Sequence, residues 1–290
     1  MQSAPRDPRY YQIGILSLLL AYGLLFLDFE IQVSIALIIL FTAQLTQYTF
    51  TRLLNLPKFD PRSALISSLS LCLLLRTETL ALAALAAFIT IGSKFVIRWN
   101  NKHIFNPTNF ALVIMILLFD SAWVSSGQWG RDLLFIVLIA SLGMIVINRS
   151  RRSDITFAFL GFYAAMIFGR ALWLGDPLTI PIHQFQSGAL LIFAFFMISD
   201  PMTTPNSRPG RILFAALVTL GAGYVQFILY QPNGLLYALV GCCLLTPVID
   251  RFLPAEKFQW KAPSTGQDKN RTTKSIQIQG EHHEKTHATF

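Results

Sequence analysis

The chain has 290 residues, of which 53% are hydrophobic and only 13% are charged, and its mean hydropathy is positive, +0.52. Ordinary soluble domains carry roughly 25% charged residues, so the composition excludes a typical soluble protein and predicts an all-α, polytopic membrane protein. The net charge of +8 would favour nucleic-acid binding only if the basic residues clustered on a soluble face. The three cysteines, Cys72, Cys242 and Cys243, lie in apolar runs without metal-site spacing, so we interpret them as packing residues.

The chain begins with a short basic stretch, residues 1–11, which we expect to be cytoplasmic. No small-residue cleavage site follows, so the first apolar segment is predicted to be an uncleaved helix. A helix needs about 20 apolar residues to cross roughly 30 Å of hydrocarbon. The predicted membrane domain, residues 12–252, contains segments of about this kind. In chain order they are 12–29, 31–50, 78–98, 106–120, 131–148, 155–173, 209–229 and 232–250.

Two further apolar segments, 63–75 and 187–199, are too short to cross a bilayer as helices alone, at about 1.5 Å per residue. We expect each to be a half-helix that an extended stretch completes. Both open with serine and a small residue, and both adjoin an Asp-Pro pair. These residues are Ser63-Ala64 with Asp60-Pro61, and Ser187-Gly188 with Asp200-Pro201.

The two short segments lie roughly 124 residues apart, and the same shift pairs the other segments in order. The segment that begins at Asn106-Pro107 then lies opposite the one that begins at Gln231-Pro232. Because each unit has an odd number of crossings, the second unit is inverted. The prediction is about ten transmembrane segments in two inverted five-helix repeats, repeat one over 12–120 and repeat two over 131–250, each with one half-helix.

The distribution of Lys and Arg predicts the orientation. Sixteen fall in predicted inner loops and tails: Arg6, Arg9, Arg52, Lys58, Arg62, Lys94, Arg98, Lys102, Arg149, Arg151, Arg152, Arg208, Arg211, Arg251, Lys257 and Lys261. Three fall in predicted outer loops: Arg76, Arg131 and Arg170. This bias places both termini and residues 200–211 on the cytoplasmic side. The basic residues thus set topology, and no nucleic-acid partner is expected.

The tail, residues 253–290, is polar and poor in apolar residues, so we predict that it is disordered and cytoplasmic. It carries His282, His283 and His287, which we interpret as solvated side chains rather than a metal site. We predict no metal site elsewhere in the chain.

Polar residues inside the predicted spans are mostly uncharged, and the acidic residues fall at segment ends, which disfavours a proton pump built on a mid-membrane carboxylate. The stretch "FTAQLTQYTFT" and the serines of 63–75 could hold a neutral or phosphate-bearing ligand, coordinate Na⁺, or join helices.

The stretch "FMISDPMTTPNSRPGR", residues 196–211, places three prolines and several polar residues between two apolar segments. Two interpretations stay open: a re-entrant turn followed by a capped helix, or a phosphate or cofactor seat at a helix N-terminus. In the first interpretation Asp200 accepts hydrogen bonds from amides such as those of Met202 and Thr203. The candidate binding residues for a flavin or solute are Ser63, Asn106, Pro107, Ser187, Gly188, Asp200, Thr203 and Thr204.

Three stretches resemble a known family. "SGALLIFAFFMISDPMTTP" is similar to the signature near the end of the membrane subunits RnfD and NqrB, "SALISSLSLCLLL" to their first half-helix, and "KHIFNPTNFALV" to their Asn-Pro helix start. The resemblance covers roughly residues 10 to 252. It implies ten helices in two inverted halves, an architecture similar to that of urea transporters. It also implies electron transfer between flavins, coupled to ion translocation.

One feature departs from the family pattern. Family members in the large complexes carry FMN on the threonine of a Ser-Gly-Ala-Thr motif. Here Leu190 follows Ser187-Gly188-Ala189, and leucine has no hydroxyl to esterify. We therefore expect no covalent FMN, whereas a non-covalent flavin stays open and the cofactor is otherwise unknown. The resemblance is closest to compact, stand-alone RnfD-like proteins.

The leading prediction is an integral membrane RnfD/NqrB-like subunit in electron transfer coupled to ion or solute transport. The alternative is a channel or carrier for a small neutral solute on the same inverted-repeat scaffold. In either case the chain has no self-contained catalytic site, and it would be at most a subunit of a redox-driven translocase. Its expected partners are the lipid bilayer and redox subunits, and its expected location is the bacterial inner membrane.

Overall fold

A computed structural model describes residues 7–26, 32–100, 102–124, 133–150 and 152–258. Pro8–Phe258 form one unit. The ends of the predicted N-terminal stretch and tail, residues 1–6 and 259–290, lie outside the described residues, as do Arg131 and Arg151.

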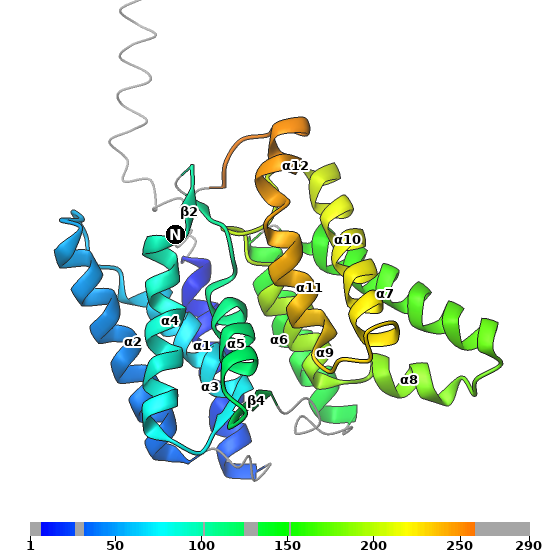
Figure 1. Cartoon of the computed structure of the whole chain (residues 1–290), viewed down its shortest axis with the longest axis horizontal. Helices are drawn as coiled ribbons and strands as arrows, with labels where there is room; N and C mark the ends of the chain where they lie inside the picture. Colours follow the sequence, from blue (N-terminus) through cyan, green and yellow to red (C-terminus); the bar gives the residue numbers. More distant parts are fainter. Residues whose placement is uncertain (1–6, 27–31, 101, 125–132, 151, 259–290) are drawn as a thin grey trace, which may run out of the picture. The chain divides into compact units, whose positions relative to one another are not determined.

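The described residues of the first half form five helices and four short strands, whose arrangement is drawn in Figure 1. In order they are α1 (Pro8–Phe26), α2 (Val33–Leu53), α3 (Pro61–Leu74), β1 (Leu75–Thr77), α4 (Leu80–Val96), β2 (Arg98–Trp99), β3 (Lys102–His103), α5 (Pro107–Leu118) and β4 (Ala122–Val124). β2 and β3 form an antiparallel hairpin, and β1 pairs antiparallel with β4 in the register Arg76↔Trp123.

The second half is helical throughout its described elements. In order they are α6 (Leu133–Ser150), α7 (Ser153–Leu174), α8 (Thr179–Phe185), α9 (Gly188–Ile192), the π-helix η2 (Phe193–Met197), α10 (Arg208–Phe227), α11 (Gly234–Cys243) and α12 (Thr246–Phe252).

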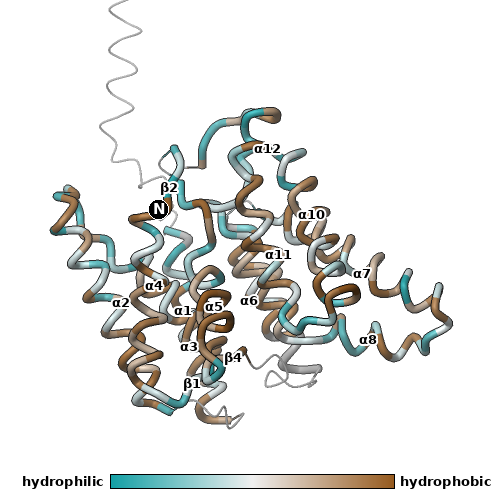
Figure 2. The backbone as a smooth tube through the Cα atoms, viewed as in Figure 1, coloured by the Kyte–Doolittle hydropathy of each residue, from teal (hydrophilic) through white to brown (hydrophobic). Residues whose placement is uncertain are grey.

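Within the described ranges, four helices are long and apolar enough to cross a membrane: Arg9–Phe26, Val33–Leu53, Ser153–Leu174 and Arg208–Phe227. The number rises to six if each of two bent helix pairs counts as one span. Large apolar side chains lie exposed on these helices, among them Leu25, Leu172 and Trp173, which is 87% exposed. Figure 2 shows hydrophobic residues along most of the helices and hydrophilic residues in the β2–β3 hairpin. Apolar surface of this extent indicates a lipid environment, so the chain is a multi-pass membrane protein.

Local sequence explains where the key helices begin. Asp60 and Asn106 are the N-caps of α3 and α5, and each is followed by proline, whose missing N–H would have no helical partner at that position. Asn106 accepts a hydrogen bond from the amide of Asn109 at 3.1 Å. Ser207 caps α10 in the same way, accepting from the amide of Gly210 at 3.1 Å.

The short segment 63–75 is observed as part of a 14-residue helix, α3, that continues into the extended strand β1. Arg76, which the charge pattern assigns to an outer loop, is instead buried in this strand. Its guanidinium donates to the carbonyls of Leu75 at 2.7 Å and Cys72 at 3.2 Å. A cation at the carbonyl end of a helix is stabilised by the helix dipole.

Three features of the second half differ from the sequence-based expectation. Helix α8 precedes the second half-helix, in a region predicted as a connection. The half-helix itself changes from α to π geometry at Phe193. The predicted single segment 232–250 is broken into α11 and α12, which meet at an angle of 50°. Pro247 at the start of α12 limits continuation of the preceding helix, because proline has no N–H to donate.

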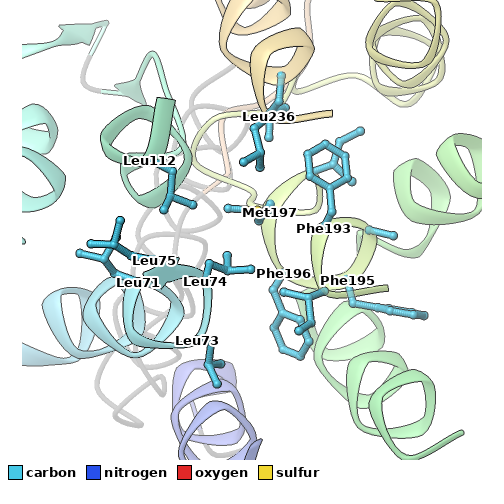
Figure 3. Close-up of a cluster of buried hydrophobic side chains, with 14 of the residues drawn as sticks. Leu71, Leu73, Leu74, Leu75, Leu112, Phe193, Phe195, Phe196, Met197 and Leu236 are labelled. Atoms are coloured by element: carbon cyan, nitrogen blue, oxygen red, sulfur yellow. The ribbon is translucent and has the colours of Figure 1, made fainter. Parts of the chain in front are cut away.

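The two half-helices meet in one apolar cluster. Figure 3 shows Leu73 and Leu74 of α3 beside Phe196 and Met197 of η2. Leu112 of α5, Leu236 of α11 and further residues of α3, β1 and η2 complete the cluster, and all of them are buried. The three cysteines are also free and buried, as packing residues are. The described core therefore fills the space between the half-helices with hydrocarbon side chains.

Close packing of α6 against η2 yields the first prediction. A Cβ added to Gly143 would lie 2.5 Å from Cγ of the buried Phe195, so Gly143→Ala forces the two helices apart. Overpacking of this kind costs about 1–3 kcal/mol. We expect a lower melting temperature for Gly143→Ala in detergent, measured by intrinsic fluorescence.

Gly161→Ala in α7 is the matched control, because nothing lies within 4 Å of its added Cβ. Alanine is favoured over glycine in a helix by up to about 1 kcal/mol, so this variant should be as stable as the parent or more so. Equal melting temperatures for the two variants would contradict the close α6–η2 contact.

Candidate functional site

The segment 200–207, between η2 and α10, leaves helical geometry and is held by side chains from other parts of the chain. Lys102 of β3 donates to the Thr204 carbonyl at 2.7 Å, and Thr246 of α12 donates to the Thr203 carbonyl at 3.2 Å. Arg152, between α6 and α7, donates to the carbonyls of Pro205 and Pro201. Non-helical backbone in a membrane protein persists where protein satisfies it, and these contacts do so.

Two acidic residues anchor the segment that leads into α10. Asp250 of α12 accepts from the backbone amide of Asn206 at 2.7 Å, from its side chain at 2.8 Å and from Lys102 at 3.3 Å. Asp154 in the first turn of α7 binds Arg211 through Nε at 2.8 Å. Both pairs are mostly shielded from solvent. Their charges are therefore compensated within the protein.

Asp200 occupies the centre of this network. Its carboxylate accepts from the Met202 amide at 3.0 Å and from the Asn106 side chain at 3.4 Å, which links the segment to the start of α5. The amide of Thr203 instead bonds to the backbone carbonyl of Asp200 at 3.2 Å. Burial raises the pKa of the Asp200 carboxyl, while the Met202 amide and the charges of Lys94, Arg152 and Lys102 oppose that rise.

The first half-helix has its own buried cation. Lys94, in the last turn of α4, donates to the Ser63 carbonyl at 2.8 Å and to its hydroxyl at 3.2 Å. Ser67 in turn donates to the Ser63 carbonyl at 3.1 Å, and Thr108 of α5 donates to the Ser67 carbonyl at 3.1 Å. Lys94 and Thr108 therefore join α4 and α5 to α3, chiefly through carbonyls of α3, whereas the Ser67 hydroxyl bonds within α3 itself.

The eight candidate residues fall into two groups. Asn106 and Asp200 bond to each other, Pro107 is buried directly after Asn106, and Thr203 and Thr204 follow Asp200. Ser63 joins this group through Lys94, whose ammonium lies close enough to Asp200 to act on it electrostatically. Ser187 and Gly188, by contrast, lie at the opposite end of the helix formed by α9 and η2. The structure thus gathers six candidates and separates two.

Ser187 lines a cavity of about 510 Å³ beside the apolar cluster. The cavity lies where the end of α3, strand β4, the start of α9 and the start of α11 come together. Its aromatic lining residues are Trp123, Tyr163 and Phe193, and its amide lining residues are Gln184, Gln226, Gln231 and Asn233. Leu74, Met197 and Leu236 of the apolar cluster also line it. The described lining carries neither an acidic nor a basic side chain.

This lining fits an uncharged planar ring better than a phosphate group. Aromatic faces and amides suit a ring such as that of a flavin, with a few polar groups to orient it. A phosphate monoester needs cations or free amides, and the described lining supplies no cation. Leu190 also lines the cavity, where it presents a hydrocarbon side chain in place of an esterifiable hydroxyl.

The second half of the chain is similar in sequence to proteins of one known family. Residues 123–259 match the model of the NQR2, RnfD, RnfE family. The predicted resemblance to RnfD and NqrB is confirmed. Several relatives are RnfD subunits of ion-translocating oxidoreductase complexes. The RnfD of Sodalis glossinidius is 33% identical over 97 residues, 32% of this chain and 28% of the relative.

The other RnfD relatives match over similar lengths. That of Tolumonas auensis is 35% identical over 78 residues, 26% of this chain and 21% of the relative. That of Escherichia coli O81 is 26% identical over 131 residues, 45% of this chain and 33% of the relative. The RnfD-like chain therefore spans about a third or less of the length of these relatives.

Sequence reasoning missed most residues that hold the 200–207 segment in this RnfD-like chain. It assigns Lys102, Arg152 and Asp250 only to charge topology or helix ends. The sequence shows that charged residues flank the Pro-rich segment 200–207. It does not show that Arg211 pairs with Asp154 or Lys102 with Asp250, because the members of each pair lie tens of residues apart in the chain.

The Asp200 contacts yield the second prediction. Asp200→Ala leaves the Met202 amide buried without an acceptor, so we expect a loss of about 1–3 kcal/mol in stability. Asp200→Asn keeps a carbonyl oxygen and should lose less. Thermal unfolding in detergent measures both.

The control is Asp176→Ala, because the Asp176–Arg170 pair is exposed and such pairs contribute about 1 kcal/mol or less. Two results together would contradict this prediction: both Asp200 variants are as stable as the control, and both lose the proposed electron-transfer activity equally. The carboxylate would then be a functional group rather than a structural one.

Proposed function

We propose that this chain is a membrane subunit that takes part in electron transfer coupled to ion or solute transport, without covalent FMN. The family match and the ion-translocating oxidoreductase complexes to which the RnfD relatives belong support this proposal. The observation that carries it is the uncharged, partly aromatic cavity beside the apolar cluster, which offers space for a redox-active ring inside the membrane part. Redox partners in a complex would supply and remove the electrons.

We further propose that the fold is a pair of inverted five-helix repeats with about ten transmembrane segments. The packing of the elements supports this pairing. In repeat one α1 packs on α3, α2 on α4, and α4 on α5. In repeat two α6 packs on α9–η2, α7 on α10, and α10 on α11.

Contacts between the two halves support a two-fold axis. The first helices contact each other, α1 with α6, and so do the fifth, α5 with α11. Asn109 of α5 donates to the Leu236 carbonyl of α11 at 3.0 Å across this junction. An axis that relates two repeats brings equivalent elements together, and binding sites in inverted-repeat transporters lie at such junctions.

A channel or carrier for a small neutral solute is the second candidate. The absence of charged side chains from the described cavity lining favours an uncharged ligand. The space between the half-helices is filled by the apolar cluster, so passage of a solute between them would require the cluster to open. The filled space between the half-helices therefore favours the electron-transfer function over a solute channel.

Flavin content distinguishes the two candidates. We expect the purified chain to show flavin absorbance near one equivalent, released completely by acid or detergent denaturation because Leu190 forms no phosphoester. A protein band that still fluoresces on a denaturing gel would show covalent attachment at another residue. A flavin-free chain that conducts a neutral solute in liposomes without redox partners would favour the second candidate.

The orientation is tested by two single cysteines, because the three native cysteines are buried. Thr179, at the start of α8, is exposed and lies in a predicted outer loop, and Glu256 is exposed in the predicted inner tail. We expect a membrane-impermeant maleimide added to intact cells to label Thr179→Cys and not Glu256→Cys. Labelling in the reverse order would overturn the proposed orientation, which rests on the charge bias.

A further inference from the structure

A second cavity, of about 710 Å³, shares no lining residue with the cavity beside Ser187. It is formed by the β2–β3 hairpin, Asn206, α12 and residues 254–257, and we call it the α12 pocket. Helix α12 turns by 50° from α11, so it leaves the direction of the preceding helix at the end of the membrane part. The pocket therefore opens where helices end and polar chain begins.

The charge of the α12 pocket is positive. Its lining contains Lys102, Arg251 and Lys257 against the single acid Asp250. Asp250 is already satisfied by Lys102 and by two hydrogen bonds from Asn206. His103 adds no charge at neutral pH, because burial and the neighbouring charges of Lys94 and Arg98 lower its pKa to about 3.

Two of the cations are available to a ligand. Arg251 is exposed and has no hydrogen-bond or ion-pair partner among the described residues. Lys257 is exposed and makes one long contact, 3.4 Å, with the Asn100 carbonyl. Two cations at one pocket match a phosphate group, since guanidinium and ammonium donate charge-assisted hydrogen bonds to phosphate oxygens.

The rim of the pocket is apolar and aromatic. Trp99, Val248 and Phe252 line it and are exposed, Phe252 by 78%. Exposed aromatic residues beside basic residues at helix ends are typical of the boundary between hydrocarbon and headgroups. A soluble phosphate compound would gain little from this rim, whereas a lipid would place its acyl chains against it.

We propose that the α12 pocket binds the phosphate headgroup of an anionic phospholipid. Arg251 and Lys257 hold the phosphate, and Trp99 and Phe252 contact the glycerol and upper acyl region. Basic pockets at the ends of transmembrane helices bind anionic headgroups in this way. This site goes beyond the proposed electron-transfer function and does not depend on it.

The test is native mass spectrometry of the full chain in detergent with dioleoyl phosphatidylglycerol or dioleoyl phosphatidylcholine added separately. We expect the parent to bind phosphatidylglycerol more tightly. The double variant Arg251→Gln, Lys257→Gln should lose affinity for phosphatidylglycerol by about 30-fold, at roughly five-fold for each cation near a headgroup. Arg251→Lys, which keeps the charge, should retain most of the affinity.

The matched control is Lys58→Gln, Arg208→Gln, which removes two exposed cations from the same predicted face outside the pocket. This control should stay within about two-fold of the parent, because its cations do not contact the ligand. An equal loss in both double variants would show general surface attraction and overturn the site. Equal binding of the two lipids by the parent would overturn it as well.

A soluble ligand is distinguished by competition. Inorganic phosphate or FMN at millimolar concentration should leave bound phosphatidylglycerol in place. If either displaced the lipid from the parent, the pocket would be a site for a soluble phosphate compound and the lipid proposal would be wrong. Flavin absorbance of the purified chain reports on the separate electron-transfer proposal in the same samples.

Discussion

The structure depends on one constraint: backbone that leaves helical form inside a membrane protein must find its hydrogen-bond partners in protein. Segment 200–207 is where this constraint acts most strongly. Its carbonyls are bonded by Lys102, Arg152 and Thr246, and its first amides by Asp200. Because these partners come from both halves of the chain, the segment ties α4–α5, α6–α7 and α12 together. The end of the second half-helix is fixed by the same contacts.

The interior of the described unit has three regions: a polar network, an apolar cluster and a cavity. The polar network around Asp200 follows the end of the α9–η2 helix, whereas the cavity is lined along this helix from Ser187 to Met197. The side chains of α3, η2, α5 and α11 form the apolar cluster. Charge is therefore kept away from the cavity, where an uncharged ring or solute would be favoured.

The candidate site is only partly predictable from the sequence. The hydrogen bond from the Met202 amide to the Asp200 carboxylate can be predicted from the Asp-Pro turn, because aspartate in a turn commonly accepts from the amide two residues later. Asn106-Pro107 as a helix start follows from capping chemistry. The separation of Ser187 and Gly188 from the other six candidates does not, because it depends on where the two short helices lie in the fold. The functions of Lys102, Arg152 and Asp250 in holding the segment also require the fold.

The sequence by itself determined the class of the protein, the positions of its apolar helices and its family resemblance. These properties depend on local quantities: hydropathy over about 20 residues, prolines and caps at helix starts, and the motifs around residues 106 and 200. Tertiary structure alone decided the π geometry of 193–197, the bend between α11 and α12, the burial of Arg76 against the end of α3, and the cavities. Each of these results from contacts between residues far apart in the chain, whose combined packing and hydrogen bonding outweigh local preference.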